Sequence, residues 1–250
     1  MNIILEDRKK QPKKGCRKLY LDISDQLAKN GIKMGRDAVY RFLRERRLLV
    51  RKSKLHHVTT YSKHHYYKSP NLIKDLIPTG AEQVWVADIT YLQLADGHAY
   101  LALVTDLYSK RIVGYQVGLK MPAKLVINAL KMGLDNRMYP ERELIHHSDR
   151  GIQYCCPEFT QFALLNGVRL STTQQSDPYE NAVAERVNGI LKYEFGLREK
   201  LPNLETAQKM VAQAVSIYNS KRRHMSLDMQ TPDFAHRNEQ HQYKKYSLNV

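Results

Sequence analysis

The sequence has little cysteine and no long apolar run. Its three cysteines are Cys16, Cys155 and Cys156, two adjacent and one distant, so they provide neither a disulfide framework nor a C-x-x-C zinc spacing. No run of 18 or more apolar residues occurs, which excludes a membrane-spanning helix, and the first residues are too polar for a secretory signal. These absences predict a protein of a reducing cytoplasm that has no membrane partner.

Positive charge is concentrated in the first third of the chain. Residues 1–80 carry 20 Lys and Arg against 7 Asp and Glu, whereas residues 81–250 carry 20 against 18. A basic arm on a near-neutral body predicts a polyanionic partner, DNA or RNA, that is bound in a salt-sensitive way. The alternative is a basic, solvated tail that only aids solubility. A hydrophobic content of 42% is enough for a folded core, so the chain is not disordered.

Two short amphipathic helices are predicted near the N-terminus, over residues 17–29 and 36–48, with a turn at Asn30-Gly31. The second helix carries Arg41, Arg44 and Arg47. This pattern indicates a helix-turn-helix-like DNA-binding module over residues 1–50, although an ordinary helical hairpin has the same pattern. Residues 51–80 are polar and basic, which is typical of a linker.

Strands and helices alternate from residue 84 onward. The predicted elements are strands at 84–92, 99–107 and 112–117, a helix from 122, a strand at 144–147, a helix at 157–166, a strand at 168–170, and helices at 180–195 and 204–219. This is the order of a ribonuclease H-like α/β fold with a mixed sheet, here over residues 81–200. Residues 201–250 are predicted to form a helix and a polar tail that has little left to bury.

Three carboxylates stand out within these elements. Asp88 lies in mid-strand on the same face as Val84, where burial is costly unless a metal ion, an arginine or a hydrogen-bond network pairs with it. Asp149 follows a strand and precedes Gly151, at the edge where α/β sheets bind ligands, but an acid in a turn is also common. Glu185 lies on a helix, where the alternative is a solvated face.

The Glu185 helix face also carries three polar residues at helical spacing, opposite the apolar stripe. These are Asn181, Asn188 and Lys192. Sixty residues separate Asp88 from Asp149, and 35 separate Asp149 from Glu185. In a ribonuclease H-like fold these positions converge, and clustered carboxylates call for Mg²⁺ or Mn²⁺, as two ions. Such a pair of ions supports in-line displacement at a phosphodiester by water or a 3′-hydroxyl.

Four segments of the chain carry a family resemblance. They are WVADITY (85–91), HSDRGIQY (147–154), SDPYENAVAERVNGILKYEF (176–195) and YNSKRRHMSLDMQTP (218–232). Over residues 15–235 the sequence resembles insertion-sequence transposases of the retroviral-integrase superfamily, specifically insertion-sequence family three, second reading frame. The resemblance implies that Asp88, Asp149 and Glu185 are a metal-binding catalytic triad for DNA cleavage and strand transfer.

The resemblance also implies a second set of residues that contact DNA or support the site. This set comprises Asn181, Asn188, Lys192, Arg222 and His224. For Arg222 and His224, helix packing and capping is an equal alternative. The implied partners are the element ends and target DNA, further copies of the chain in a homo-oligomer on DNA, and the upstream-frame product as a fusion. The implied location is the prokaryotic cytoplasm, at the nucleoid when bound to DNA.

Two other functions remain open at this point. A related metal nuclease would cut DNA without joining it. A non-catalytic, regulatory remnant of a transposase would bind the element ends and block transposition. The spacing before Glu185 and the C-terminal motif argue against the nuclease, and the intact acidic residues argue against the remnant.

Overall fold

The computed structural model describes residues 1–50, 64–174 and 181–243. The chain divides into two compact units, Met1–His57 with Lys192–Gly196, and Val58–Leu191 with Leu197–Val250. Within the described ranges, no helix is both long and apolar enough to cross a lipid bilayer.

The N-terminal unit contains three helices, α1 (Asn2–Lys10), α2 (Cys16–Lys29) and α3 (Arg36–Glu45). Helices α2 and α3 confirm the two predicted helices, whereas α1 was not predicted. Leu19, Ile23 and Leu43 are fully buried in the core of this unit because their spacing places them on the inner faces of their helices. The buried Lys14 ammonium pairs with Asp7 at 2.8 Å and with Asp22 at 2.7 Å, which links α1 to α2.

The larger unit follows the predicted order of strands and helices. Its elements are β1 (Val84–Leu94), β2 (Gly97–Asp106), β3 (Ile112–Gly118), α4 (Ala123–Leu134), β4 (Leu144–Ser148), α5 (Ile152–Cys155), α6 (Pro157–Leu165), β5 (Val168–Thr172), α7 (Ala182–Glu194), α8 (Leu204–Lys221), the 3₁₀ turn η1 (Met225–Leu227) and α9 (Pro232–Asn238). The short helix α5, the turn η1 and helix α9 were not predicted.

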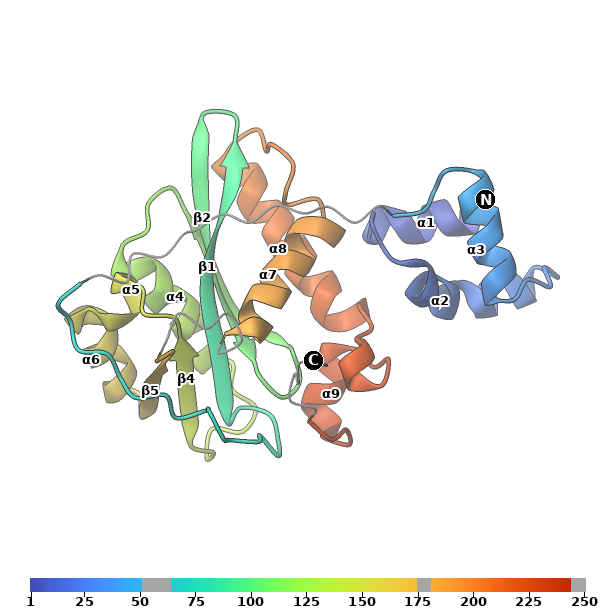
Figure 1. Cartoon of the computed structure of the whole chain (residues 1–250). Helices are drawn as coiled ribbons and strands as arrows, with labels where there is room; N and C mark the ends of the chain where they lie inside the picture. The colour runs from blue at the N-terminus through green and yellow to red at the C-terminus, as the bar shows by residue number, and fades with distance from the viewer. Residues whose placement is uncertain (51–63, 175–180, 244–250) are drawn as a thin grey trace. The chain divides into compact units, whose positions relative to one another are not determined.

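The five strands form one mixed sheet in the order β3-β2-β1-β4-β5 (Figure 1). Strands β1, β2 and β3 are antiparallel neighbours, and β4 and β5 run parallel to β1. The central strand β1 pairs with β4 up to Ala87 and Ser148, so the residues that follow, Asp88 and Asp149, leave the ladder at the same end. This mixed sheet with flanking helices confirms the predicted ribonuclease H-like fold.

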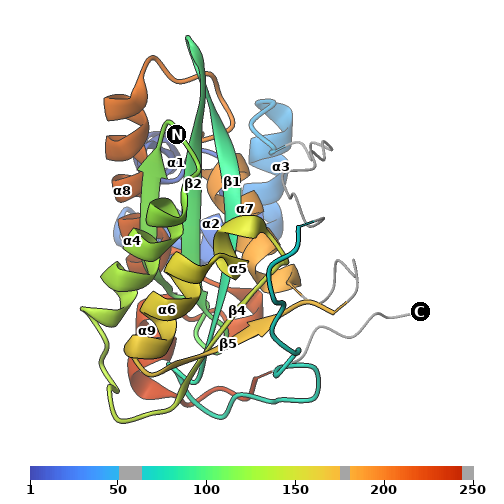
Figure 2. The same ribbon diagram turned by 90° about the vertical axis from the view of Figure 1, so that its left-hand side faces the viewer.

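Helices cover both faces of the sheet (Figures 1 and 2). On one face α4, α5 and α6 pack over a core that includes the fully buried Trp85. The close approach of α4 to β3 requires a glycine, because a Cβ at Gly114 would lie 2.0 Å from the Ala129 carbonyl oxygen. On the other face Val84 and Val86 pack against the start of α7. The side chain of Asp88 belongs to this second face by strand alternation.

The expectation that the tail from residue 221 has little to bury was wrong, because Arg222, His224 and Leu227 are all buried. The end of the preceding helix, α8, is also held by hydrogen bonds. Tyr218 donates a hydrogen bond to the Lys110 carbonyl at 2.9 Å. The Asn219 side-chain amide accepts from the Ile112 N–H and donates to the Ile112 carbonyl, both at 2.9 Å. On α9, His236 is fully buried. Apart from Leu227, these side chains are polar, so sequence periodicity does not show that hydrogen bonds to distant strands allow them to be buried.

Part of the predicted linker packs on the sheet. The Leu72 N–H donates to the Ser171 hydroxyl at 2.9 Å, and the Thr172 hydroxyl donates to the Ser69 carbonyl at 2.6 Å, so this segment runs beside β5. The rest of the predicted linker, residues 51–63, lies outside the described residues. The domain boundaries at 50, 80 and 200 stay a prediction.

Candidate active site

Asp88 lies in the middle of β1, on the side of the sheet that α7 covers. The Asn188 amide on α7 donates a hydrogen bond to Asp88 Oδ2 at 2.8 Å. Burial, together with the nearby charges of Asp149 and Glu185, raises the pKa of the Asp88 carboxyl to about 7, although the Asn188 hydrogen bond opposes this rise. Two further carboxylates therefore act on Asp88 through space, and no cationic side chain is among the main influences on its pKa.

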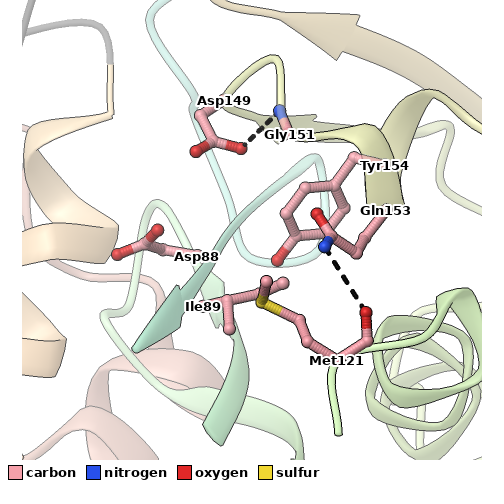
Figure 3. A pocket seen from close by; sticks show the side chains of 7 residues that line it. All are labelled: Asp88, Ile89, Met121, Asp149, Gly151, Gln153 and Tyr154. Carbon is pink, nitrogen blue, oxygen red and sulfur yellow. Dashed lines mark hydrogen bonds between the residues drawn. The ribbon is translucent and has the colours of Figure 1, made fainter. Parts of the chain in front are cut away.

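Asp149 directly follows β4 and lines the same pocket as Asp88 (Figure 3). The Gly151 N–H donates to Asp149 Oδ1 at 3.0 Å, which turns the chain sharply after the strand. Space at Gly151 is limited, since a Cβ there would lie 3.0 Å from that same oxygen. The remaining residues that line the pocket are Ile89, Met121, Gln153 and Tyr154.

Glu185 lies in the first turn of α7 and is exposed. The expectation that its helix face lies opposite the buried side was wrong for two of its members. Asn181 and Asn188 are 6% and 5% exposed, and Asn181 donates to the Ala87 carbonyl of β1 at 2.9 Å. Helix α7 is therefore fixed on β1 by two amides, one on each side of Glu185 in the sequence, beside Asp88.

The donor set fits a hard divalent cation, although the geometry of a closed site is absent. In the described part of the chain, no three His, Cys, Asp or Glu side chains are grouped closely enough to hold a metal ion. Asp88 and Asp149 nevertheless share one pocket, and burial together with the charge of Asp149 raises the Asp88 pKa. A divalent cation would relieve that repulsion, and carboxylate oxygens are the ligands that Mg²⁺ and Mn²⁺ prefer.

The predicted DNA contacts fall into two groups. Arg41, Arg44 and Arg47 are exposed on and just after α3, and Lys192 on α7 is partly buried. By contrast, Arg222 and His224 are 3% and 7% exposed, and their side-chain nitrogens lie 2.9 Å apart. This burial fits the packing alternative for the C-terminal pair. A DNA contact by any of these residues stays a prediction.

Tyr154 lines the pocket but was not singled out from the sequence. It is 4% exposed, and its ring packs edge-on against Phe159 with centroids 5.5 Å apart. The sequence feature that could have identified Tyr154 is its position five residues after Asp149 within HSDRGIQY. Tyr154 lies on helix α5, which was not predicted.

Comparisons with known proteins agree with this fold. Two models, each described as an integrase core domain, match residues 78–178 and 166–232. An uncharacterized 31 kDa protein of insertion element IS600 from Shigella sonnei is 36% identical over 222 residues, which cover 88% of this chain and 81% of that protein. The transposase InsF for insertion sequence IS3A from Escherichia coli K12 is 32% identical over 204 residues, covering 81% of this chain and 70% of that protein.

Solved viral integrases share the fold at low sequence identity. A simian T-cell lymphotropic virus intasome in complex with a PP2A regulatory subunit contains a chain with 16% identity and a TM-score of 0.55 over 95% of this chain and 76% of that chain. The HTLV-2 integrase catalytic core domain with magnesium, in its trimeric form, has 18% identity and a TM-score of 0.51 over 63% of this chain and 97% of that chain.

The fold and the matched domains define an integrase-core protein, a class of polynucleotidyl transferases. The similarity to InsF over most of both chains is more specific. The chain belongs to the IS3 family of insertion-sequence transposases, as the sequence motifs predicted.

Proposed function

We propose that this transposase cuts and joins DNA with divalent cations that are held by Asp88, Asp149 and Glu185. The observation that carries the proposal is the shared pocket of Asp88 and Asp149, with the Asp88 pKa raised by burial and then by the charges of Asp149 and Glu185. Bound Mg²⁺ or Mn²⁺, as two ions, supplies the positive charge that activates the attacking hydroxyl and stabilises the leaving oxygen.

The protein side chains supply position. Adjacent parallel strands hold Asp88 and Asp149 in register, and the Asn188 amide fixes the orientation of the Asp88 carboxylate. The attacking group is water for strand cleavage and a 3′-hydroxyl for strand transfer. No nucleophilic side chain is needed, and the buried cysteine beside the pocket, Cys155, has its pKa raised to about 11 by burial, so it stays a thiol.

The test is the substitution Asp149→Asn. We expect it to reduce both nicking and strand transfer by at least about a thousandfold, because several kcal/mol of transition-state stabilisation depend on the cations. The assay measures joining of a pre-cut 3′-hydroxyl end into target DNA with Mg²⁺, beside a gel-shift measurement in which DNA binding persists. The matched control is Asp96→Asn, an exposed acid in the β1–β2 turn, which should keep full activity.

The outcomes separate this proposal from its two alternatives. Full strand transfer by the Asp149→Asn variant would show that the proposed site is wrong. A wild-type chain that nicks but never joins is a nuclease. A wild-type chain that binds the element ends, yet neither nicks nor joins them, is a regulatory remnant.

We further propose that the N-terminal helices contact DNA through Arg41, Arg44 and Arg47. These side chains are exposed on a unit that has its own buried core. Replacing all three with alanine should weaken DNA binding and reduce the slope of log affinity against log salt by about 0.9 for each phosphate that is no longer neutralised. An unchanged slope would place the DNA contact elsewhere on the protein.

The remaining proposals concern assembly and location. We propose a homo-oligomer on DNA, since joining two element ends requires more than one protomer, and light scattering with end DNA measures it. A fusion with the product of an upstream frame predicts an overlapping frame in the flanking DNA. The chain acts in the prokaryotic cytoplasm, at the nucleoid, which fractionation of cells can test.

A further inference from the structure

The hydroxyl of Tyr154 is buried without a hydrogen-bond partner among the described residues. Two other buried tyrosines are satisfied, because Tyr108 donates to the His241 carbonyl at 2.7 Å and Tyr218 donates to the Lys110 carbonyl at 2.9 Å. An unsatisfied buried hydroxyl costs about 1–3 kcal/mol, so the Tyr154 hydroxyl destabilises the free chain.

The unsatisfied hydroxyl belongs to the pocket of the two aspartates. Figure 3 shows the Tyr154 ring between Asp149 and Met121, with its hydroxyl end directed to the side where Asp88 lies. The two other donors drawn there are engaged by the protein, since the Gly151 N–H bonds Asp149 and the Gln153 amide bonds the Met121 carbonyl at 3.4 Å. The Tyr154 hydroxyl has no such acceptor among the described residues.

The hydroxyl also keeps its proton beside two carboxylates. Burial raises the pKa of Tyr154 well above its usual value, and the charges of Asp149 and Asp88 raise it further. The group is therefore a neutral O–H donor throughout the physiological range. An anionic phosphodiester that enters a pocket lined by aspartates needs such donors, because the carboxylates repel it.

We propose that Tyr154 donates a hydrogen bond to a non-bridging oxygen of a DNA phosphodiester that is bound in this pocket. That DNA is the substrate here rests on the proposed function. The hydroxyl is closed to solvent in the free chain, and Met121 lies next to it in Figure 3. Met121 is unbranched and only partly buried, so it can move aside when DNA enters.

The substitution Tyr154→Phe removes only the hydroxyl and keeps the packing against Phe159. We expect strand transfer of a pre-cut end to slow by about 10- to 100-fold, the effect of one hydrogen bond to a charged group. We expect the melting temperature to stay level or rise, because an unsatisfied polar atom is removed. The matched control is Tyr218→Phe, which removes a satisfied hydrogen bond and should melt earlier while keeping its rate.

A second measurement does not depend on turnover. Protein labelled with ¹³C at the phenol carbon of tyrosine is titrated with a duplex that has a recessed 3′-hydroxyl, in Mg²⁺, and the Tyr154 resonance is identified by its absence from the spectrum of Tyr154→Phe. The proposal predicts a shift at Tyr154 that exceeds the shift at Tyr218. No shift, or an unchanged rate in Tyr154→Phe, overturns it. If the wild-type chain shows the shift but never joins DNA, the result contradicts the proposed strand transfer and leaves the proposed Tyr154 hydrogen bond intact.

Discussion

Two pairs of carboxylates lie beside β1, Glu82 with Asp106 at its start and Asp88 with Asp149 farther along, and their surroundings are opposite. At the start of β1, Glu82 accepts hydrogen bonds from His236 at 3.2 Å and from the Met138 and Tyr139 N–H groups at 2.8 and 3.0 Å. Burial alone raises the Glu82 pKa, but these hydrogen bonds outweigh burial and bring it to about 2. In mid-strand, burial and two neighbouring acids bring the pKa of Asp88 to about 7.

The difference separates a structural acid from a functional one. Arg137 lies 3.2 Å from Glu82, and the second buried acid of that end, Asp106, accepts from the Glu82 and Ser109 N–H groups at 2.7 Å. The protein thus supplies donors and positive charge wherever an acid serves only the fold. Asp88 receives one side-chain amide, from Asn188, and two like charges. The proposed cations would supply the positive charge that Arg137 supplies to Glu82.

The sharpest test of this comparison is to neutralise one acid of each pair, Glu82 in the first and Asp88 in the second. Glu82→Gln should lower the free energy of unfolding by about 3–5 kcal/mol, because it leaves the partly buried Arg137 without the carboxylate that pairs with it. Asp88→Asn should raise the free energy of unfolding by about 1–2 kcal/mol, because it removes repulsion from Asp149, while it abolishes strand transfer. Urea unfolding without divalent metal measures both.

The exposed Asp96→Asn substitution is the control for both variants and should change stability by no more than about 0.5 kcal/mol. If the two substitutions shift stability in the same direction, the surroundings of Glu82 and Asp88 do not differ in the way that their hydrogen bonds indicate.

A smaller effect concerns pH. The folded pKa of Glu82 is about 2, below its ordinary value of 4.5, so the unfolded chain binds the proton first as pH falls. The stability from Glu82 is therefore present above about pH 4.5 and is lost as pH falls toward 2. Between about pH 5.5 and pH 2.5, wild type should lose about 2–3 kcal/mol more than Glu82→Gln in urea unfolding. Equal losses would contradict the assigned pairing of Glu82.

The sequence was sufficient for the order of strands and helices because apolar periodicity carries that information. The mid-strand position of Asp88 on the face shared with Val84 was also predictable, since strand residues alternate. The burial of Asn181 and Asn188 was not predictable, because an amide is expected at the surface until its partner strand is known. Whether Glu185 joins the two aspartates around cations stays a prediction.

The C-terminal residues show the same limit more strongly. Arg222 and His236 were assigned to a polar tail and Asn219 to the end of the helix before it, yet all three are buried. Asn219 and His236 each have a hydrogen-bond partner more than a hundred residues earlier in the chain, Ile112 and Glu82 respectively. No local pattern encodes such pairs, and a segment that buries polar groups against distant partners has no hydrophobic signature.

The contact between Glu82 and His236 also has a consequence for biosynthesis. These residues are 154 positions apart, and they anchor the strand that carries Asp88. While the chain emerges from the ribosome, the anchor of β1 stays incomplete until α9 has been translated. A nascent chain that stalls before this point therefore lacks the hydrogen bond of His236 to Glu82, and its central strand is held less firmly than in the finished protein.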